Sequence, residues 1–544
     1  MSDLAARRVL VIGLDGATFR TLAPWAAAGE MPELARLMAA GCHGELRSTF
    51  PPLTPPAWAS FMTGKNPGKH GVFSFRRPAV SGYRSGDLIT ANHLRARTLW
   101  EILGDAGRRV GAINVPPSYP VRAVNGFMVA CLMAPPGEAN VVYPPELAAV
   151  LPDDYAISIE PPRQLLPGDP SYREQCLEYL GRLRRLAAQR LAVTLRLQRE
   201  QPWDLLSVVF YEPDRIQHFF WSHLAAAGPA GVGPDVVAEI AGEARAIFRQ
   251  LDGAIAELVR AAGPEAVTLV VSDHGFGPAP DRFVYVNRWL ADHGYLHARK
   301  SWRWRRRLVR RLPARLRARY DTLEHIFVDW SRSRAWCEVM ETRSAGVWVN
   351  LRGRQPEGRV EPGAEYEAVR EEIRSALADL RENGRPVFAL VARREDVYRG
   401  PVTDQAPDLL LYAAPSHGLM FSGIRPELRA RGVFAPFVEY GFTGAHEPAG
   451  IYVAAGPGIA ALGRQPEAPI EALAPTILWL LGVPVPDGMD APPLLDLMTP
   501  HARAAAPVRY VPDSDPVPVD ETGWRSEEDR AEVEARLRAL GYVE

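Results

Sequence analysis

Three aspartates and three histidines lie near the ends of short apolar runs, where side chains of this kind could form a metal site. They are Asp15 after VLVIGL, Asp214 and His218 in YEPDRIQH, Asp273 and His274 in SDHGFG, and His446 in GFTGAHEPAG. This set supplies hard oxygen and borderline nitrogen donors without thiolate, which suits Zn²⁺ or Mn²⁺. DxxxH is common by chance, and an Asp–His pair ending a buried strand has little packing role. The combination predicts a metal centre.

A candidate nucleophile lies in the segment TFPPLTPPAWASFMTGKNPGKHG. Thr54 stands among prolines, where a rigid turn could fix the direction of its hydroxyl. Residues 57–62 read as the start of a helix, whose amides could stabilise an oxyanion. A threonine hydroxyl is a poor nucleophile unless a divalent cation activates it. The alternative role of Thr54 is that of a helix N-cap, and the two roles are compatible.

The elements that must position these residues alternate between strand and helix. We expect buried parallel strands, apolar throughout their length, at residues 9–14, 110–114, 205–210, 267–272, 409–412 and 451–454. We expect helices between them, among them residues 31–40, 173–199 and 236–262. This alternation predicts an α/β fold with a doubly wound, mostly parallel sheet. Function then collects at the carboxyl ends of the strands, where all the candidate ligands except His446 lie; His446 would reach the site from a loop.

Composition sets broad limits on the class of protein. The 544 residues carry 63 Lys and Arg against 64 Asp and Glu, so the whole-chain charge gives no argument for a nucleic-acid polymer or a membrane. An anionic substrate must therefore be held by a local site. Four scattered cysteines favour buried thiols over disulfides. The N-terminus lacks the features of a signal peptide or membrane span, which makes cytoplasmic residence the expectation.

The order Asp, Thr in a proline turn, TGxxPxxHG, DxxxH, SDHG and late GxH resembles the type I phosphodiesterase/nucleotide pyrophosphatase branch of the alkaline phosphatase superfamily. The resemblance implies an alkaline-phosphatase-like fold and two divalent ions, with Zn²⁺ preferred over Mn²⁺. One ion would be held by Asp15, Thr54, Asp273 and His274, and the other by Asp214, His218 and His446. It further implies that Thr54 attacks phosphorus of a small phosphorylated substrate and that water hydrolyses the phospho-threonine intermediate. YVNRWL, VWVNLRGRQPEG and APDLLLY look like a prokaryotic subgroup of phosphodiesterase-like proteins.

One position departs from the family pattern. Nucleotide pyrophosphatases carry a phosphate-contacting Asn after HG, where this chain has Phe75 in HGVFSF. Lys65 and Asn66 are candidates for its replacement, although each is more typical of a solvated turn. The physiological substrate stays open among diester, monoester, pyrophosphate and phosphonate.

Several other functions are weighed against this one. Thr54 cannot become the aldehyde of sulfatases, and Trp58 stands where their motif needs Arg. VIGLDGAT lacks the first Asp of haloacid dehalogenase phosphatases, since Gly13 takes that place. Phosphomutase or phosphonate hydrolase chemistry remains within the superfamily, and an inactive member that binds a ligand or partner is the non-enzyme alternative. Metal content measured together with turnover of p-nitrophenyl esters separates these readings.

Two segments interrupt the strand–helix alternation. Residues 298–320 hold many arginines with Trp302 and Trp304, which indicates either a solvated helical cap or a surface that contacts anionic molecules. We predict a catalytic domain over residues 1–500 with a basic helical cap at about 278–335, and a C-terminal extension over 501–544. The extension could dock on the core or mediate assembly. The oligomeric state is left open.

Overall fold

The chain forms two compact units. The computed structural model describes residues 8–135, 138, 140–161, 165–299, 327–428, 430–436, 441–513, 524 and 526–540. Unit 1 comprises residues 1–75, 88–279 and 440–544, and unit 2 comprises 76–87 and 280–439. The candidate ligands and Thr54 all belong to unit 1. Most of the arginine-rich stretch, residues 300–320, lies outside the described residues.

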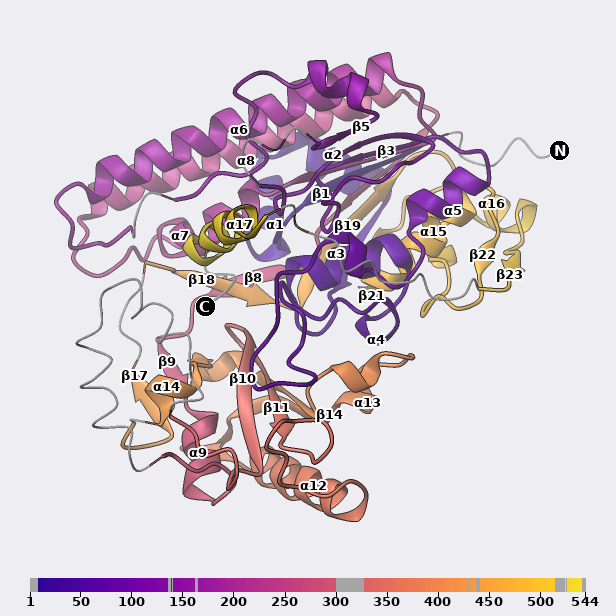
Figure 1. The fold of residues 1–544 in the computed structure, drawn as a ribbon. Helices are drawn as coiled ribbons and strands as arrows, with labels where there is room; N and C mark the ends of the chain where they lie inside the picture. Colours follow the sequence, from indigo (N-terminus) through magenta and orange to yellow (C-terminus); the bar gives the residue numbers. More distant parts are fainter. Residues whose placement is uncertain are drawn as a thin grey trace. The chain divides into compact units, whose positions relative to one another are not determined.

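Unit 1 is built on a mostly parallel sheet, as the sequence predicts. Within the described residues its strands run in the order β20-β2-β19-β7-β1-β6-β3-β4-β5, with β21 beside β2 (Figure 1). Their bounds are β1 Arg8–Leu14, β2 Cys42–Arg47, β3 Val110–Ile113, β4 Gly126–Val129, β5 Val142–Tyr143, β6 Leu205–Phe210, β7 Ala266–Val271, β19 Ala449–Ala455, β20 Gly463–Arg464 and β21 Ala468–Pro469. The central strands β7, β1, β6, β3 and β4 are mutually parallel. Their carboxyl ends therefore meet at one edge.

Helices cover both faces of this sheet, which explains why its strands are apolar throughout. In β1, Val9 and Val11 enter one core, and Leu10, Ile12 and Leu14 enter the other. The first core also contains α3 Thr54–Thr63, α5 Leu99–Asp105, α15 Leu473–Leu480, α16 Pro500–Ala505 and α17 Glu527–Ala539. The second contains α1 Phe19–Ala27, α2 Pro32–Ala40, α6 Tyr172–Glu200, α7 Glu212–Leu224 and α8 Pro234–Ala262. The doubly wound arrangement is confirmed.

Two of the expected parallel strands behave differently. The strand at residues 451–454 lies in the central sheet as part of β19, but it runs antiparallel to both β7 and β2. The strand at 409–412 is β15 (Leu409–Ala413) and belongs to an antiparallel sheet of unit 2. An apolar run shows that a strand is buried on both faces but not which strands pair with it. The expected direction was therefore wrong for residues 451–454, and the expected sheet and direction were wrong for residues 409–412.

Unit 2 is a smaller α/β unit around its own core. Its main sheet has the order β10-β11-β15-β14 and packs with α12. The elements are β9 Arg282–Val284, α9 Val286–Asp292, β10 Ala335–Glu341, β11 Ser344–Val349, α12 Ala364–Ala378, β12 Arg381–Glu382, β13 Arg385–Pro386, β14 Phe388–Arg393, α13 Arg394–Val397, β15 Leu409–Ala413, β16 Leu419–Met420, α14 Ile424–Glu427 and β17 Phe434–Pro436.

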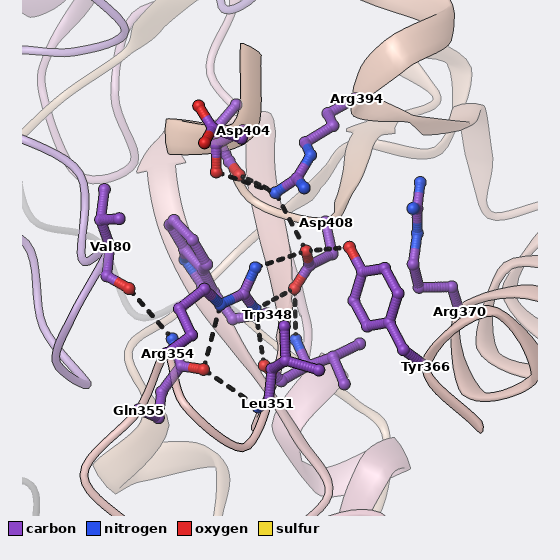
Figure 2. Close-up of polar contacts among 12 residues, drawn as sticks. Val80, Trp348, Leu351, Arg354, Gln355, Tyr366, Arg370, Arg394, Asp404 and Asp408 are labelled. Atoms are coloured by element: carbon purple, nitrogen blue, oxygen red, sulfur yellow. Dashed lines mark hydrogen bonds and ion pairs between the residues drawn. The ribbon is translucent and has the colours of Figure 1, made fainter. Parts of the chain in front are cut away.

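A buried charge cluster joins the elements of unit 2. It contains Asp408 from the motif APDLLLY and Arg354 from the motif VWVNLRGRQPEG. The carboxylate of Asp408, from APDLLLY, accepts two hydrogen bonds from Arg354 (2.8 and 2.5 Å) and one from Arg394 (3.1 Å). The Tyr366 hydroxyl donates to it at 2.6 Å and the Val349 amide at 2.7 Å (Figure 2). Asp408 is fully buried. These residues hold β11, α12, α13 and β15 together.

The C-terminal region docks on unit 1. Val533, Leu537 and Leu540 of α17 lie in the same core as α3 and α5. β22 (Val485–Pro486) pairs in parallel with β23 (Tyr510–Val511). All four cysteines are described, buried and free. Among the helices that the structure describes, none has an apolar stretch long enough to cross a membrane.

Candidate metal centre

The carboxyl ends of β1 and β7 bring Asp15 and Asp273 together. The two strands pair in parallel with Gly13 opposite Val271, so the residues two positions further on also face each other. The amide of Gly16 donates to Asp273 Oδ1 at 3.1 Å, and Gly16 adopts a φ of +68° that favours glycine. His274 follows Asp273 and places Nε2 3.3 Å from Asp273 Oδ2 and 3.7 Å from Asp15 Oδ1. One cluster therefore has two carboxylates and one imidazole.

Thr54 joins this cluster as the first residue of α3. Its Oγ1 lies 3.4 Å from His274 Nε2, and the side chain is fully buried. Leu53 occupies the cap position, so Thr54 is not the N-cap of the helix. The expectation that α3 presents several amides to an oxyanion is also not met. Pro55 and Pro56 have no N–H, and the Ala57 amide donates to Leu53 O.

Asp214 and His218 lie on one face of α7, which begins directly after β6. Asp214 Oδ1 is 3.4 Å from His218 Nε2, as their spacing predicts. His446 Nε2 lies 3.2 Å from the same carboxylate oxygen and 2.9 Å from His218 Nε2. A second cluster therefore has one carboxylate and two imidazoles. The rings of His274 and His446 are 3.9 Å apart between centroids, so the two clusters are neighbours.

His446 reaches the site from a strand, not from the loop that the sequence suggested. β18 (Gly444–Glu447) pairs antiparallel with β8 (Gly275–Pro278), and His446 is opposite Phe276. β8 starts immediately after His274. This two-stranded antiparallel ribbon of β8 and β18 therefore holds His446 beside the SDHG motif, although the two are far apart in the sequence. Four residues rich in small side chains carry too little periodicity for this strand to be recognised in the sequence.

The spacing of the donor atoms fits divalent ions. Ligands about 2.1 Å from a tetrahedral zinc lie about 3.4 Å from one another. The distances within the second cluster are 3.4, 3.2 and 2.9 Å, and those from His274 Nε2 to its cluster are 3.3, 3.4 and 3.7 Å. Two buried groups have convergent ligand atoms, one of Asp15, Asp273 and His274 and one of Asp214, His274 and His446, so His274 lies within reach of both clusters. The set offers only oxygen and nitrogen donors, which suit Zn²⁺ or Mn²⁺.

Buried carboxylate oxygens in the first cluster lack hydrogen-bond donors. Asp15 Oδ1 and Asp273 Oδ2 have no such donor within the described part of the chain. Burial and the neighbouring Asp273 and Asp214 charges raise the pKa of Asp15, and burial raises the pKa of Asp273 to about 6. A cation bound between these oxygens would remove both the repulsion and the desolvation cost.

Two of the histidines, His274 and His446, are in the neutral form that binds metal. Burial lowers the pKa of His274 to about 4 and that of His446 to about 4, so both imidazoles are neutral at pH 7. Burial alone would raise the pKa of Asp214, but the charge of His218 and hydrogen bonds from His218 and His446 outweigh it and hold this pKa well below its usual range. The Asp214 carboxylate is therefore ionised, which is the form that binds a metal ion.

Three residues that support the site were not recognised in the sequence. Trp58 Nε1 donates to Asp15 Oδ2 at 3.3 Å, and a Cβ at Gly13 would lie 2.5 Å from the Trp58 ring. Arg215 Nη1 donates to Asp214 Oδ2 at 3.1 Å. The Phe276 ring packs edge-on against His218 and His446, with centroids 4.8 and 5.1 Å away. All three residues stand next to or within the motifs, which could have pointed to them. The sequence does not show, however, which way their side chains point.

The proposed substitutes for the missing asparagine are engaged elsewhere. Lys65 Nζ forms a salt bridge with Asp513 at 2.5 Å. The Asn66 side chain accepts from the Gly68 amide as the N-cap of α4 (Pro67–His70) and donates to Asp490 at 2.8 Å. Phe75 is buried in the core. Lys65 and Asn66 are therefore both held by contacts within the chain.

Carboxylates and imidazoles gather at the carboxyl edge of a doubly wound sheet, where α/β proteins bind their ligands. The sequence profile of the type I phosphodiesterase/nucleotide pyrophosphatase family matches residues 9–423. The chain belongs to this family of metal-dependent phosphoester hydrolases. No curated protein sequence matches it.

Solved structures resemble this chain at low sequence identity. Phosphonoacetate hydrolase from Sinorhizobium meliloti 1021, in complex with phosphonoacetate, is 17% identical with a TM-score of 0.50; the alignment covers 83% of this chain and 90% of that one. Human ectonucleotide pyrophosphatase/phosphodiesterase 5 is 15% identical with a TM-score of 0.49, covering 90% and 100%. The first likeness supports the alkaline-phosphatase-like architecture of the chain.

Proposed function

We propose that the protein hydrolyses phosphoester bonds of a small phosphorylated substrate through a phospho-threonine intermediate on Thr54. The observation that carries this proposal is the position of the Thr54 hydroxyl. It is buried on the first residue of a helix, 3.4 Å from His274 Nε2, in the cluster that contains the donor-free oxygens of Asp15 and Asp273. A hydroxyl used only for capping would not be placed among potential metal ligands.

Two divalent ions, of which Zn²⁺ suits the three imidazoles best, would lower the pKa of the nucleophilic hydroxyl and neutralise charge on the phosphoryl and leaving oxygens. Asp15, Asp273, His274 and Thr54 would hold one ion. Asp214, His218 and His446 would hold the other. The short distances within each cluster support this division, and His274, which also lies near Asp214 and His446, would make the two ions neighbours.

The chain's own residues then perform two substitutions at phosphorus. Thr54 Oγ1 forms a bond to phosphorus while the bond to the ester oxygen breaks, and the leaving alcohol takes up a proton. Water next attacks phosphorus, the Thr54 Oγ1–phosphorus bond breaks, and the hydroxyl is restored. Pro55 and Pro56 restrict the backbone behind Thr54, which keeps the attacking oxygen in one direction.

The test uses purified protein loaded with Zn²⁺ or Mn²⁺ and a panel of p-nitrophenyl mono- and diesters. We expect Thr54→Ala to lower kcat by about a thousandfold or more, since the covalent route is removed. Thr54→Ser should retain measurable turnover. Acid quenching during turnover should trap phosphate on the Thr54 peptide, detected by mass spectrometry.

Thr63→Ala is the matched control, because Thr63 is a buried threonine at the other end of the same helix. It should keep the wild-type kcat per folded molecule. Full activity in Thr54→Ala would refute the nucleophile assignment. Two bound metals without turnover of any ester in the panel would refute the enzyme and favour the ligand-binding alternative.

A further inference from the structure

A buried arginine of the C-terminal helix lies where the sheet's carboxyl edge carries the metal cluster. Arg536 belongs to α17 (yellow in Figure 1) and is 4% exposed. Its Nη2 donates to the carbonyls of Leu132 and Ala134 at 2.6 and 2.7 Å. These carbonyls follow β4, which runs parallel to β3 and, through it, to β6. The segment that binds Arg536 is therefore at the edge where α7 begins.

Hydrogen bonds connect this segment to the metal ligands. The Leu132 amide donates to the Tyr211 hydroxyl at 3.2 Å, and Tyr211 immediately precedes α7. α7 carries Asp214 and Arg215 in its first turn, and Arg215 is also buried. The charge of Arg215 acts on Arg536: burial and the Arg215 charge together lower the pKa of Arg536 to about 10. The Arg536 guanidinium is therefore still cationic at pH 7.

The positive charge of Arg536 is not balanced by an adjacent carboxylate. Its Nε has no hydrogen-bond partner within the described residues. The carboxylates whose charges act on Arg536 are Glu160 and Glu532, and both are exposed to solvent. Buried charges are normally paired, because an isolated one bears a large desolvation cost. Guanidinium groups suit carboxylate and phosphate oxygens in particular.

We propose that Arg536 and Arg215 form an anion subsite beside the metal centre, which binds a second carboxylate or phosphate group of the substrate. The inference rests on the proposed function for the placement of the scissile phosphorus at the metals. The substrate would then carry two anionic groups, one that reacts and one that is held by the guanidinium pair. This role also explains why a charged side chain of α17 is directed into an otherwise apolar docking face formed by Val533 and Leu537.

The test compares stable ligands of matched length by calorimetry on zinc-loaded protein. Propylphosphonate has one anionic group, 2-carboxyethylphosphonate adds a carboxylate, and ethane-1,2-diphosphonate adds a second phosphonate. We expect wild type to bind at least one of the doubly anionic ligands about tenfold or more tightly than propylphosphonate. The stronger of the two identifies the second group.

Arg536→Gln should remove this preference for the doubly anionic ligand. Arg536→Lys should keep part of the preference, since lysine retains the positive charge but lacks the planar guanidinium group. Arg538→Gln is the control, because Arg538 is an exposed arginine two residues along the same helix. It should keep the full preference. Melting curves of each variant verify folding.

Equal affinity of the wild type for all three ligands would overturn the subsite, as would a preference that survives in Arg536→Gln. These outcomes do not depend on turnover. The proposed function is tested separately by the p-nitrophenyl esters. If the protein prefers the doubly anionic ligand but hydrolyses no ester, the anion subsite is supported and the proposed hydrolase activity is refuted.

Discussion

Asp273 in unit 1 and Asp408 in unit 2 are both fully buried carboxylates, yet the chain surrounds them in opposite ways. Asp408 accepts hydrogen bonds from Arg354, Arg394, Tyr366 and the Val349 amide. Although burial would raise its pKa, the bonds and charge of Arg354 lower the net value. Asp273 accepts from the Gly16 amide, its Oδ2 has no donor within the described residues, and its pKa is raised to about 6.

This difference separates a structural cluster from a binding cluster. Around Asp408 the chain provides its own cations, so the cluster is complete when unit 2 folds. Around Asp273 and Asp15 the chain places more negative charge without enough positive charge, which folding alone would not favour. An external cation would complete such a cluster, so the deficit of positive charge supports the proposed metal site.

Asp273→Asn offers the largest expected effect. Loss of one anionic ligand should lower kcat/KM for a p-nitrophenyl ester by about a thousandfold, because a bound metal contributes several kcal/mol to the transition state. The free energy of unfolding of the metal-free variant should equal or exceed that of wild type, since one repulsive buried charge is gone. Urea unfolding in chelator measures this. A large loss of metal-free stability would show that Asp273 is structural, as Asp408 is.

Asp408→Ala should have the opposite effect, lowering the free energy of unfolding much more than it lowers kcat/KM. Removing the carboxylate leaves Arg354 and Arg394 buried without their partner, which should cost about 3–5 kcal/mol of unfolding free energy. Glu365→Ala is a suitable control, because Glu365 and Arg334 form an exposed pair at 3.8 Å; it should change stability by less than about 0.5 kcal/mol. An Asp408→Ala protein as stable as the control would contradict the comparison.

The smallest expected effect is a pH dependence of metal stabilisation. Because the folded-state pKa of Asp273 is about 6, above its usual value near 4, the metal-free native state retains a proton that the unfolded chain releases. This contribution to stability is present below about pH 4 and is lost as the pH rises through 6. Zinc should therefore raise the melting temperature more at pH 8 than at pH 5, by about 2–5 °C. In Asp273→Asn this difference should shrink.

The architecture was largely predictable because the pattern of a strand buried on both faces is strong. Residues 9–14, 205–210 and 267–272 are apolar at every position for the reason that the structure shows, namely that alternate residues enter two cores. The sequence could not distinguish β15, in unit 2, or the antiparallel β19, because pairing depends on distant chain segments. The two-unit division was likewise hidden.

The candidate residues were found because their types are unusual at strand ends, and the spacing of Asp214 and His218 placed them on one helical face. The sequence could not show which way the side chains point. It did not show that Trp58 points to Asp15, that Lys65 is paired with Asp513, or that Arg536 enters the docking face of α17. The lack of amides at the start of α3 was visible in Pro55 and Pro56, and the prediction of an oxyanion site there overlooked it.

The ribbon of β8 and β18 has a consequence for how such a chain can vary. Between Pro278 and Gly444 the backbone leaves unit 1, builds most of unit 2 and returns, and the pairing of His446 with Phe276 is fixed by the ribbon itself. Length changes within the excursion do not alter that register. A graft or replacement of residues 280–439 would therefore leave the His446 imidazole in place, so this segment could be exchanged in engineering without moving that side chain.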